Sequence, residues 1–388
     1  MTERPIFFEN RRRPLCAAIA LMIVIVAVIL AAGCVGGDVT HEQDLTIIKI
    51  NHDGSMAWMK TIDSGKDDEI TDVIQTFDGG YAIAGGFSNV ACNRASHFPT
   101  TPKIIWLSEK GDIVAEREYT SELKDTYGYE NSIKGIVQTM DNGFYIISQR
   151  GMILKTNPSG IPGNKPLDNK VIHGNIELKS VIRTSEGGSA IAGVIYDSQP
   201  FVAKLDREGN QSWFTKISNE NFSKVISLIE LPGNSGYIGQ GQSSARIRPL
   251  FKLDNDGRIE NTSAINLIKD VYQIHSIPEG FAVFSMNQSM NNTFEVLSYT
   301  DEGNAITTTF LENITPDARI IADESSYFSV TVTGSFYPVN STVHAQKLDS
   351  NGKTIWDRRV TTFDKKNKYL VNVRNVIATS DGGYLIVL

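Results

Sequence analysis

Few residues of this chain are arranged for metal or nucleophilic chemistry. The 388 residues include six histidines, and no two of them lie at the spacing of a metal site. They are His41, His52, His97, His173, His275 and His344. The chain has no Gly-x-Ser-x-Gly motif, no phosphate-binding loop and no dinucleotide-binding motif. The sequence therefore predicts no catalytic constellation, no metal site and no cofactor.

Binding chemistry is expected in the longest connecting segments, because loops carry most binding residues. The segment 88–102 contains Arg94 and His97, and the segment 120–131 contains Tyr127 and Tyr129. Exposed tyrosines beside charged residues are typical of binding surfaces. We therefore treat these four residues as candidate partner-binding positions. Ordinary surface loops are the alternative interpretation.

A set of cations forms a second candidate site. Four of the expected innermost strands begin with a cation, namely Lys134, Lys179, Lys224 and Arg374. Cations that converge in a cleft attract anions, so an anion site at the mouth of a central channel is one interpretation. Three aspartates, Asp68, Asp270 and Asp317, alternate with these cations. A neutralised, water-filled channel is therefore the other interpretation.

Seven asparagines begin an Asn-x-Ser/Thr sequon, and none of them precedes residue 210. They are Asn210, Asn221, Asn261, Asn287, Asn291, Asn313 and Asn340. If they carry N-glycans, these bulky groups cover one part of the surface and leave the rest bare for a partner. A chance cluster in a half that is rich in Asn, Ser and Thr is the alternative.

The first 44 residues have the features of an export signal and a tether. Three arginines precede an uncharged apolar run from Leu15 to Ala32, and small residues then lead to Cys34. This order is typical of a lipoprotein signal, in which Cys34 becomes the lipidated first residue. An uncleaved anchor is the alternative, because eighteen apolar residues just span a bilayer. We expect an export signal or anchor at 1–33, a tether at 34–44 and an extracytoplasmic domain at 45–388.

The composition limits how this domain is stabilised and what it binds. Only Cys92 follows residue 34, so a disulfide within one copy is excluded. About 340 residues are enough to bury a substantial core. The net charge of −7 gives no electrostatic reason to expect nucleic acid as a partner.

Two motifs alternate along the domain. The first, Lys-x-Asp/Asn-x-x-Gly, follows an apolar run; Trp106 and Ser298 replace the lysine in two copies. Its glycines recur at spacings of 57, 49, 49, 48, 46 and 49 residues: Gly54, Gly111, Gly160, Gly209, Gly257, Gly303 and Gly352. The second motif, Asp-Gly-Gly-Tyr, is complete at 78–81 and 381–384 and degraded elsewhere. Both predict tight turns, because Asp-Gly and Asn-Gly supply the positive φ of hairpins.

Each repeat therefore predicts four short antiparallel strands. In the first repeat we expect strands near 70–76, 80–86, 103–107 and 113–119. Repeats of this length without helical periodicity indicate a β-propeller. The chain opens with two strands (45–51 and 56–62) and closes with two others (371–379 and 383–388). The predicted fold is thus all-β: a seven-bladed propeller of four-stranded antiparallel blades, closed by pairing of the N- and C-terminal strands.

This repeat resembles that of quinoprotein-type (PQQ-like) β-propellers and of the Asp-Gly-Gly-Tyr repeat lipoproteins of archaea and bacteria. A tryptophan follows the turn glycine by four residues at Trp58, Trp213 and Trp356, and the similar strand pattern covers 45–388. The resemblance implies that these tryptophans dock between blades. It also suggests a quinone cofactor, but no residues match those that hold the metal and quinone in such enzymes.

The expected function is that of a membrane-tethered scaffold outside the cytoplasm. The resemblance implies a role in assembling envelope proteins, so we expect a membrane or surface-layer protein, or a glycan, as partner. The alternative is an extracellular glycan lyase or hydrolase with its site at the channel mouth, which would need a close pair of carboxylates or an acid–base couple. A purely structural surface-layer protein is a third interpretation.

Overall fold

The computed structural model describes most of the residues from 45 to 388. The described residues are 45–62, 68–88, 100–123, 132–163, 176–195, 199–218, 223–243, 248–260, 271–287, 293–315, 318–323, 326–336, 339–363 and 372–388. Within them, the regular structure is β-strand apart from one 3-10 turn, η1 (Pro232–Asn234).

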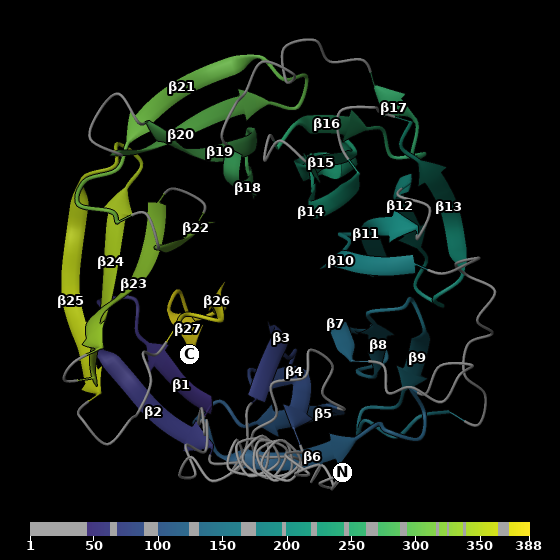
Figure 1. Cartoon of the computed structure of the whole chain (residues 1–388), viewed down its shortest axis with the longest axis horizontal. Helices are drawn as coiled ribbons and strands as arrows, with labels where there is room; N and C mark the ends of the chain where they lie inside the picture. The colour runs from purple at the N-terminus through teal and green to yellow at the C-terminus, as the bar shows by residue number, and fades with distance from the viewer. Residues whose placement is uncertain are drawn as a thin grey trace, which may run out of the picture. The chain divides into compact units, whose positions relative to one another are not determined.

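Seven sheets of the described residues stand around a ring, one for each blade (Figure 1). Blades 1 to 3 comprise β3 (Asp68–Gln75), β4 (Tyr81–Ser88), β5 (Thr100–Leu107), β6 (Ile113–Glu118); β7 (Ile133–Gln138), β8 (Phe144–Ser148), β9 (Ile153–Thr156); β10 (Ile176–Arg183), β11 (Ser189–Ile195), β12 (Gln199–Leu205) and β13 (Gln211–Lys216). Blades 4 and 5 comprise β14 (Lys224–Glu230), β15 (Tyr237–Gln242), β16 (Leu250–Leu253), β17 (Ile259–Glu260); β18 (Val271–Ile277), β19 (Gly280–Asn287), β20 (Thr293–Thr300) and β21 (Ala305–Phe310). Blade 6 comprises β22 (Arg319–Asp323), β23 (Ser326–Phe336), β24 (Val339–Asp349) and β25 (Thr354–Phe363). The predicted seven-bladed propeller is confirmed.

Blade 7 is built from both ends of the domain. It contains β1 (Leu45–Ile50), β2 (Met56–Ile62), β26 (Asn375–Ala378) and β27 (Tyr384–Val387), in the order β2-β1-β27-β26. The strand β1 pairs with β27 in antiparallel register from Ile47–Val387 to Ile50–Tyr384. This pairing confirms the predicted closure of the ring.

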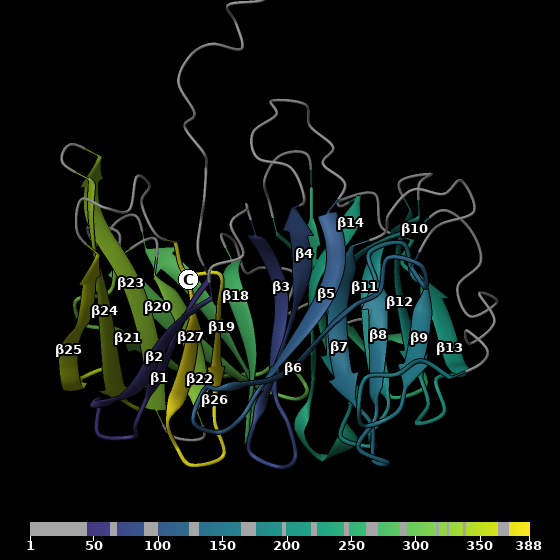
Figure 2. The same ribbon diagram turned by 90° about the horizontal axis from the view of Figure 1, so that it is seen from below.

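We name the four strands of each blade A to D, from the inner strand to the outer one. Figure 2 shows the A–B and C–D turns, such as 76–80 and 51–55, at one end of the ring. We call this end the turn face and the opposite end the loop face. In blade 2 the described residues supply strands A to C. A bridge between Thr156 and Pro162 follows them, and residues 164–175 lie outside the described residues.

The predicted strand ends of blade 1 lie within three residues of the observed ones. The largest difference is at β5, which begins at Thr100 rather than 103. Proline inside a run argues against a strand, so Pro102 made the predicted strand too short. In the structure Pro102 lies opposite Gly86 on β4, and the pairing continues to Thr100.

The core lies between neighbouring blades, so the middle strands are buried on both faces. All six residues of β1, LTIIKI, are buried, whereas the outer strand β2 alternates between exposed and partly buried positions. Side chains of blade 7, such as Ile47, pack with Ile83 and Ile105 of blade 1 in one such cluster. A continuous apolar run therefore marks a middle strand, and an alternating run marks an outer one.

The three strand-D tryptophans dock on the next blade, as the resemblance implied. Their indole N–H groups donate to turn carbonyls of that blade: Trp58 to Glu109 at 3.0 Å, Trp213 to Asn255 at 2.9 Å and Trp356 to His52 at 3.1 Å. The ring of Trp356 lies so close to Gly54 that an added Cβ would be 2.8 Å from it. Glycine is thus required there for space as well as for its φ of +85°.

Replacing Gly54 by alanine tests the docking of Trp356, with Gly79 as a matched control. Both glycines have a φ of +85°, but an added Cβ at Gly79 has nothing within 4 Å. We expect G79A to lose about 1–2 kcal/mol of unfolding free energy from backbone strain alone. We expect G54A to lose about 1–3 kcal/mol more, because the indole must move. Urea denaturation measures both, and equal losses would contradict the packing role of Gly54.

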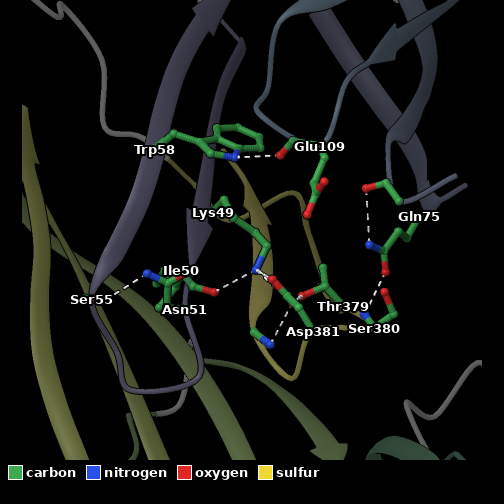
Figure 3. Close-up of polar contacts among 12 residues, drawn as sticks. Lys49, Ile50, Asn51, Ser55, Trp58, Gln75, Glu109, Thr379, Ser380 and Asp381 are labelled. Atoms are coloured by element: carbon green, nitrogen blue, oxygen red, sulfur yellow. Dashed lines mark hydrogen bonds and ion pairs between the residues drawn. The ribbon is translucent and has the colours of Figure 1, made fainter.

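A buried lysine links the two repeat motifs in blade 7 (Figure 3). Lys49 of β1 is 3% exposed, and its Nζ lies 2.8 Å from Asp381 Oδ2 in the A–B turn. Thr379 and the backbone N–H of Gly383 also donate to Asp381. Although burial acts to raise it, the hydrogen bond from Lys49 and these turn bonds hold the pKa of Asp381 at about 2.

The same lysine position is charged and paired in four further blades. Lys155 lies 3.1 Å from Asp141 and Lys204 lies 2.8 Å from Glu186, each on the A–B turn of its own blade. Lys347 lies 3.8 Å from Asp323 at the end of β22, and Lys252 lies 2.9 Å from Glu260 on β17. Strand C is therefore tied to the rest of its blade by a charge pair in each of these blades.

A hydrogen bond from a backbone N–H to a glutamine side chain then ties the turn to the next blade. Figure 3 shows the N–H of Ser380 donating to Gln75 of β3, at 2.7 Å. Phe77 donates in the same way to Gln138, also at 2.7 Å. In blade 7 the charge pair and this hydrogen bond together fix the A–B turn in place.

Removing the acid from the closing blade should cost more stability than removing its counterpart in blade 2. D381N leaves the buried Lys49 ammonium without a negatively charged partner, and we expect a loss of about 1–3 kcal/mol, since Asp381 is half exposed. D141N should lose under about 1 kcal/mol, because Lys155 is 37% exposed and water can solvate it. Urea denaturation at pH 7 measures both. Equal losses would contradict the special role of Lys49.

Candidate functional site

Polar groups from different blades meet in two regions of the described residues that bear on binding. One lies on the inner strands near the loop face, and the other consists of clefts on the turn face. The first contains three of the cations that the sequence predicted as an anion site. The second was not predicted.

β-Bulges aim two of the predicted cations away from the regular pleat. Residue 134 is skipped in the pairing of β7 with β8, and residue 179 is skipped in the pairing of β10 with β11. An extra residue in a strand redirects its side chain, and bulges often lie next to functional sites. Lys134 and Lys179, on neighbouring blades, are therefore presented alike.

Carboxylates accompany these cations. Lys179 forms an ion pair with Glu177, which also accepts a hydrogen bond from Gln149. Although burial acts to raise it, the bond and charge of Lys179, with the charge of Lys224, hold the pKa of Glu177 below its ordinary value. Burial, and then the charge of Lys179, lower the pKa of Lys134, while Asp72 opposes this. The structure brings Lys134, Lys179 and Lys224 into one cluster in which both signs of charge are present.

Asp72 of β3 is the most perturbed acid of this cluster. Its Oδ2 accepts the N–H of Ile136 in blade 2 at 2.9 Å, and its Oδ1 accepts the N–H of Val73 at 2.9 Å. Burial raises the pKa of Asp72 to about 7 in spite of these bonds and of Lys134. The sequence analysis missed Asp72 and Glu177. Asp72 lies beside a bulge of strand A, and Glu177 lies two residues from one. The sequence alone does not show where these bulges fall.

Five of the other predicted site residues lie among the described residues. Arg374 precedes β26, and its backbone N–H donates to Val387. Asn313 is exposed after β21, with a φ of +57°, and Asn210 donates to Asp206 in a turn-face hairpin. Asn287 ends β19 and Asn340 lies in β24. The remaining candidates lie outside the described residues: Cys34, Arg94, His97, Tyr127, Tyr129, Asn221, Asn261 and Asn291.

On the turn face, clefts open between neighbouring blades. The cleft between blades 3 and 4 has a volume of about 570 Å³ and is lined by Glu186, Lys204, Trp213 and Asn255, among others. Lys204 binds both Glu186 and Asn255 across it, at 2.8 and 3.1 Å. The charges of Lys204 and Glu186 thus neutralise each other.

The cleft between blades 1 and 2 has a volume of about 430 Å³ and a different lining. It is lined by Phe77, Asp78, Trp106, Gln138 and Phe144, among others. Trp106 and Phe144 meet edge to face, with their ring centroids 5.7 Å apart. The sequence signal for this cleft was the tryptophan that replaces lysine at position 106.

The raised pKa of Asp72 predicts a pH dependence of stability opposite in sign to that of an acid whose pKa is lowered by folding. Its folded pKa of about 7 lies above the ordinary value of 3.8, so the folded state holds the proton more tightly. The contribution of Asp72 is present below pH 4 and is lost as the pH rises towards 7, on the order of 4 kcal/mol in all. Asp381 acts oppositely, and its contribution is lost as the pH falls from about 4 towards 2. Urea denaturation from pH 4 to 8 should show stability falling with pH in the wild type and a flatter profile in D72N; an unchanged slope would contradict this.

Within the described residues, no group of three or more histidines, cysteines and acids is placed to hold a metal ion. That same part of the chain contains no helix long and apolar enough to cross a membrane. Comparison with models of protein families found no match. Comparison with curated protein sequences also found no significant match.

Proposed function

We propose that this chain is an extracytoplasmic, membrane-tethered β-propeller that binds a protein or glycan partner and acts as an assembly scaffold. The observation that carries the proposal is the pair of polar, aromatic-lined clefts on the turn face, of about 430 and 570 Å³. Ligand sites are typically concave and of about 300–1,000 Å³.

The rigidity of the turn face supports binding. The Lys204–Glu186 pair in one cleft, and the hydrogen bond from the Phe77 N–H to the Gln138 side chain in the other, fix part of the cleft walls before a partner arrives. A preorganised site avoids part of the entropic cost of ordering loops on binding. Pairing of β1 with β27 prevents the ring from opening at its seam.

The N-terminal segment supports attachment to a membrane. The apolar run from Leu15 to Ala32 and the following Cys34 fit a lipoprotein signal or an uncleaved anchor. A tether that joins β1 at Leu45 enters at the end of that strand opposite the 51–55 turn. The turn face is then directed away from the point of attachment. The seven sequons all follow blade 2 in the sequence, so glycans would leave blades 1 and 2 bare.

One observation favours the alternative of an extracellular glycan lyase or hydrolase. Asp72, with a pKa of about 7, lies near Lys134 and shares a cluster with Glu177 on the inner strands. A carboxyl group with a raised pKa is what general acid catalysis near neutral pH requires. This alternative places the site near the loop face, whereas the scaffold function uses the turn face.

Crosslinking in intact cells tests the scaffold proposal. V114C, at the rim of the cleft between blades 1 and 2, is compared with I306C on strand D of blade 5, both in a C92S background. Val114 and Ile306 are 63% and 47% exposed. A membrane-impermeant maleimide that carries a photoreactive group is attached to each. We expect both cysteines to be labelled in intact cells, and a single discrete adduct at V114C alone.

Two outcomes would contradict the proposal. Labelling that requires cell lysis would show that the domain is not outside the cell membrane. Labelling without an adduct, or with equal adducts at both positions, would argue against a partner site at this cleft and favour the enzyme alternative.

A further inference from the structure

We propose that the cleft between blades 1 and 2 binds a primary ammonium group, that of a lysine residue of a protein partner, with Asp78 as the carboxylate that receives it. The inference rests on the proposed binding function and names the chemistry of its ligand. It follows from a comparison of blade 1 with the other blades of the same chain.

Three blades carry a lysine and a tryptophan as a cross-strand pair on strands C and D. The pairs are Lys49–Trp58, Lys204–Trp213 and Lys347–Trp356. Blade 1 has Trp106 on strand C and Ala115 opposite it on strand D. In blade 1 a tryptophan therefore occupies the position that lysine holds in these three blades, and the lysine is absent.

The moved tryptophan still docks on the next blade. An added Cβ at Gly160 of blade 2 would lie 2.4 Å from the Trp106 ring, just as one at Gly111 would meet Trp58. However, the Trp106 indole N–H has no hydrogen-bond partner among the described residues, although Trp106 is only 8% exposed. The equivalent N–H groups of Trp58, Trp213 and Trp356 each donate to a carbonyl.

The acid that the lysine would pair with is retained. Asp78 accepts hydrogen bonds from Thr76 and from the N–H of Gly80, as Asp381 does from Thr379 and Gly383. The bond from Thr76 lowers the pKa of Asp78, so it is a carboxylate at neutral pH. Within the described ranges it forms no ion pair, whereas Asp381 and Asp141 each bind a lysine.

The aromatic part of the ammonium site is also retained. The ammonium groups of Lys204 and Lys347 lie 6.0 and 5.5 Å from the tyrosine ring that begins strand B of the next blade. Phe144 begins strand B of blade 2 and lines the cleft with Trp106. Aromatic faces attract ammonium groups. Blade 1 therefore keeps the carboxylate and the ring, and only the cation is missing.

A lysine residue of a peptide matches both kinds of unpaired group. Its ammonium would bind Asp78, and a backbone carbonyl next to it would accept the Trp106 indole N–H. A charge-assisted hydrogen bond of this kind is stronger than a neutral one. An isolated alkylamine supplies the first group but not the second.

The first experiment measures peptide binding to the full chain in detergent by fluorescence anisotropy. The probe is a fluorescein-labelled, end-capped Gly-Lys-Gly peptide, with norleucine in place of lysine as its control. We expect the lysine peptide to bind at least about tenfold more tightly than the norleucine peptide, and D78N to remove this difference. The matched control D141N, in which the altered acid already has its own lysine, should bind like the wild type.

A repeat-restoring variant tests the comparison directly. W106K/A115W gives blade 1 the Lys–Trp pair of blades 3, 6 and 7, so its lysine would occupy Asp78 from within. We expect this variant to fold with wild-type or higher stability and to lose the lysine peptide. Tight binding that survives in a folded W106K/A115W would overturn the proposal.

The location and the source of the ammonium are checked in the wild type. Of the four tryptophan indole ¹⁵N–¹H signals, only that of Trp106 should shift strongly on addition of the lysine peptide. Shifts confined to the other indoles would place the site elsewhere and overturn the proposal. Glucosamine that displaces the peptide at equal or lower concentration than a capped lysine would overturn the assignment to a protein lysine.

Failure of this inference can be separated from failure of the proposed function. An adduct at V114C without lysine-dependent peptide binding would leave the scaffold function standing and reject the ammonium site. Peptide binding that D78N abolishes, without any adduct at V114C, would support the ammonium site and reject the scaffold function.

Discussion

In four of the seven blades a lysine of strand C places its ammonium group where it is largely shielded from water. Lys49, Lys204, Lys252 and Lys347 are each less than a tenth exposed, at the same place on strand C of four blades. A buried charge without a partner is strongly destabilising. Each lysine therefore requires an acid close to its ammonium group, and in three of these blades the acid lies on the A–B turn or at its start. The requirement links strand C to strand A through the middle of the sheet.

Most of the architecture could be predicted because each repeat is marked by local sequence signals. Turn glycines need a positive φ, and middle strands need continuous apolar runs, so both are visible in single residues. The count of blades and the composite blade follow from their order. The extension of β5 through Pro102 was not predicted, since a favourable register with β4 overrides the local signal of one residue.

The sites were harder to predict, because they depend on register rather than on residue type. The lysine of the repeat was recognised, but not its pairing with the turn acid, since the two lie up to 332 positions apart in the chain. Asp72 lies near Lys134 only because strands A of adjacent blades meet around the axis. Trp106 was noted only as a weaker copy of the motif. Its exchange of place with the strand-D tryptophan is recognised only from the register, which puts Ala115 opposite it.

The pairing of β1 with β27 has a consequence for biogenesis. The strand that pairs with the first strand of the domain is synthesised more than three hundred residues after it. Until then this mostly apolar strand, LTIIKI, has a free edge that can pair with other chains. A nascent chain that emerges N-terminus first therefore needs something to cover that edge. Membrane attachment close to residue 45 would hold each edge apart from its neighbours during that interval.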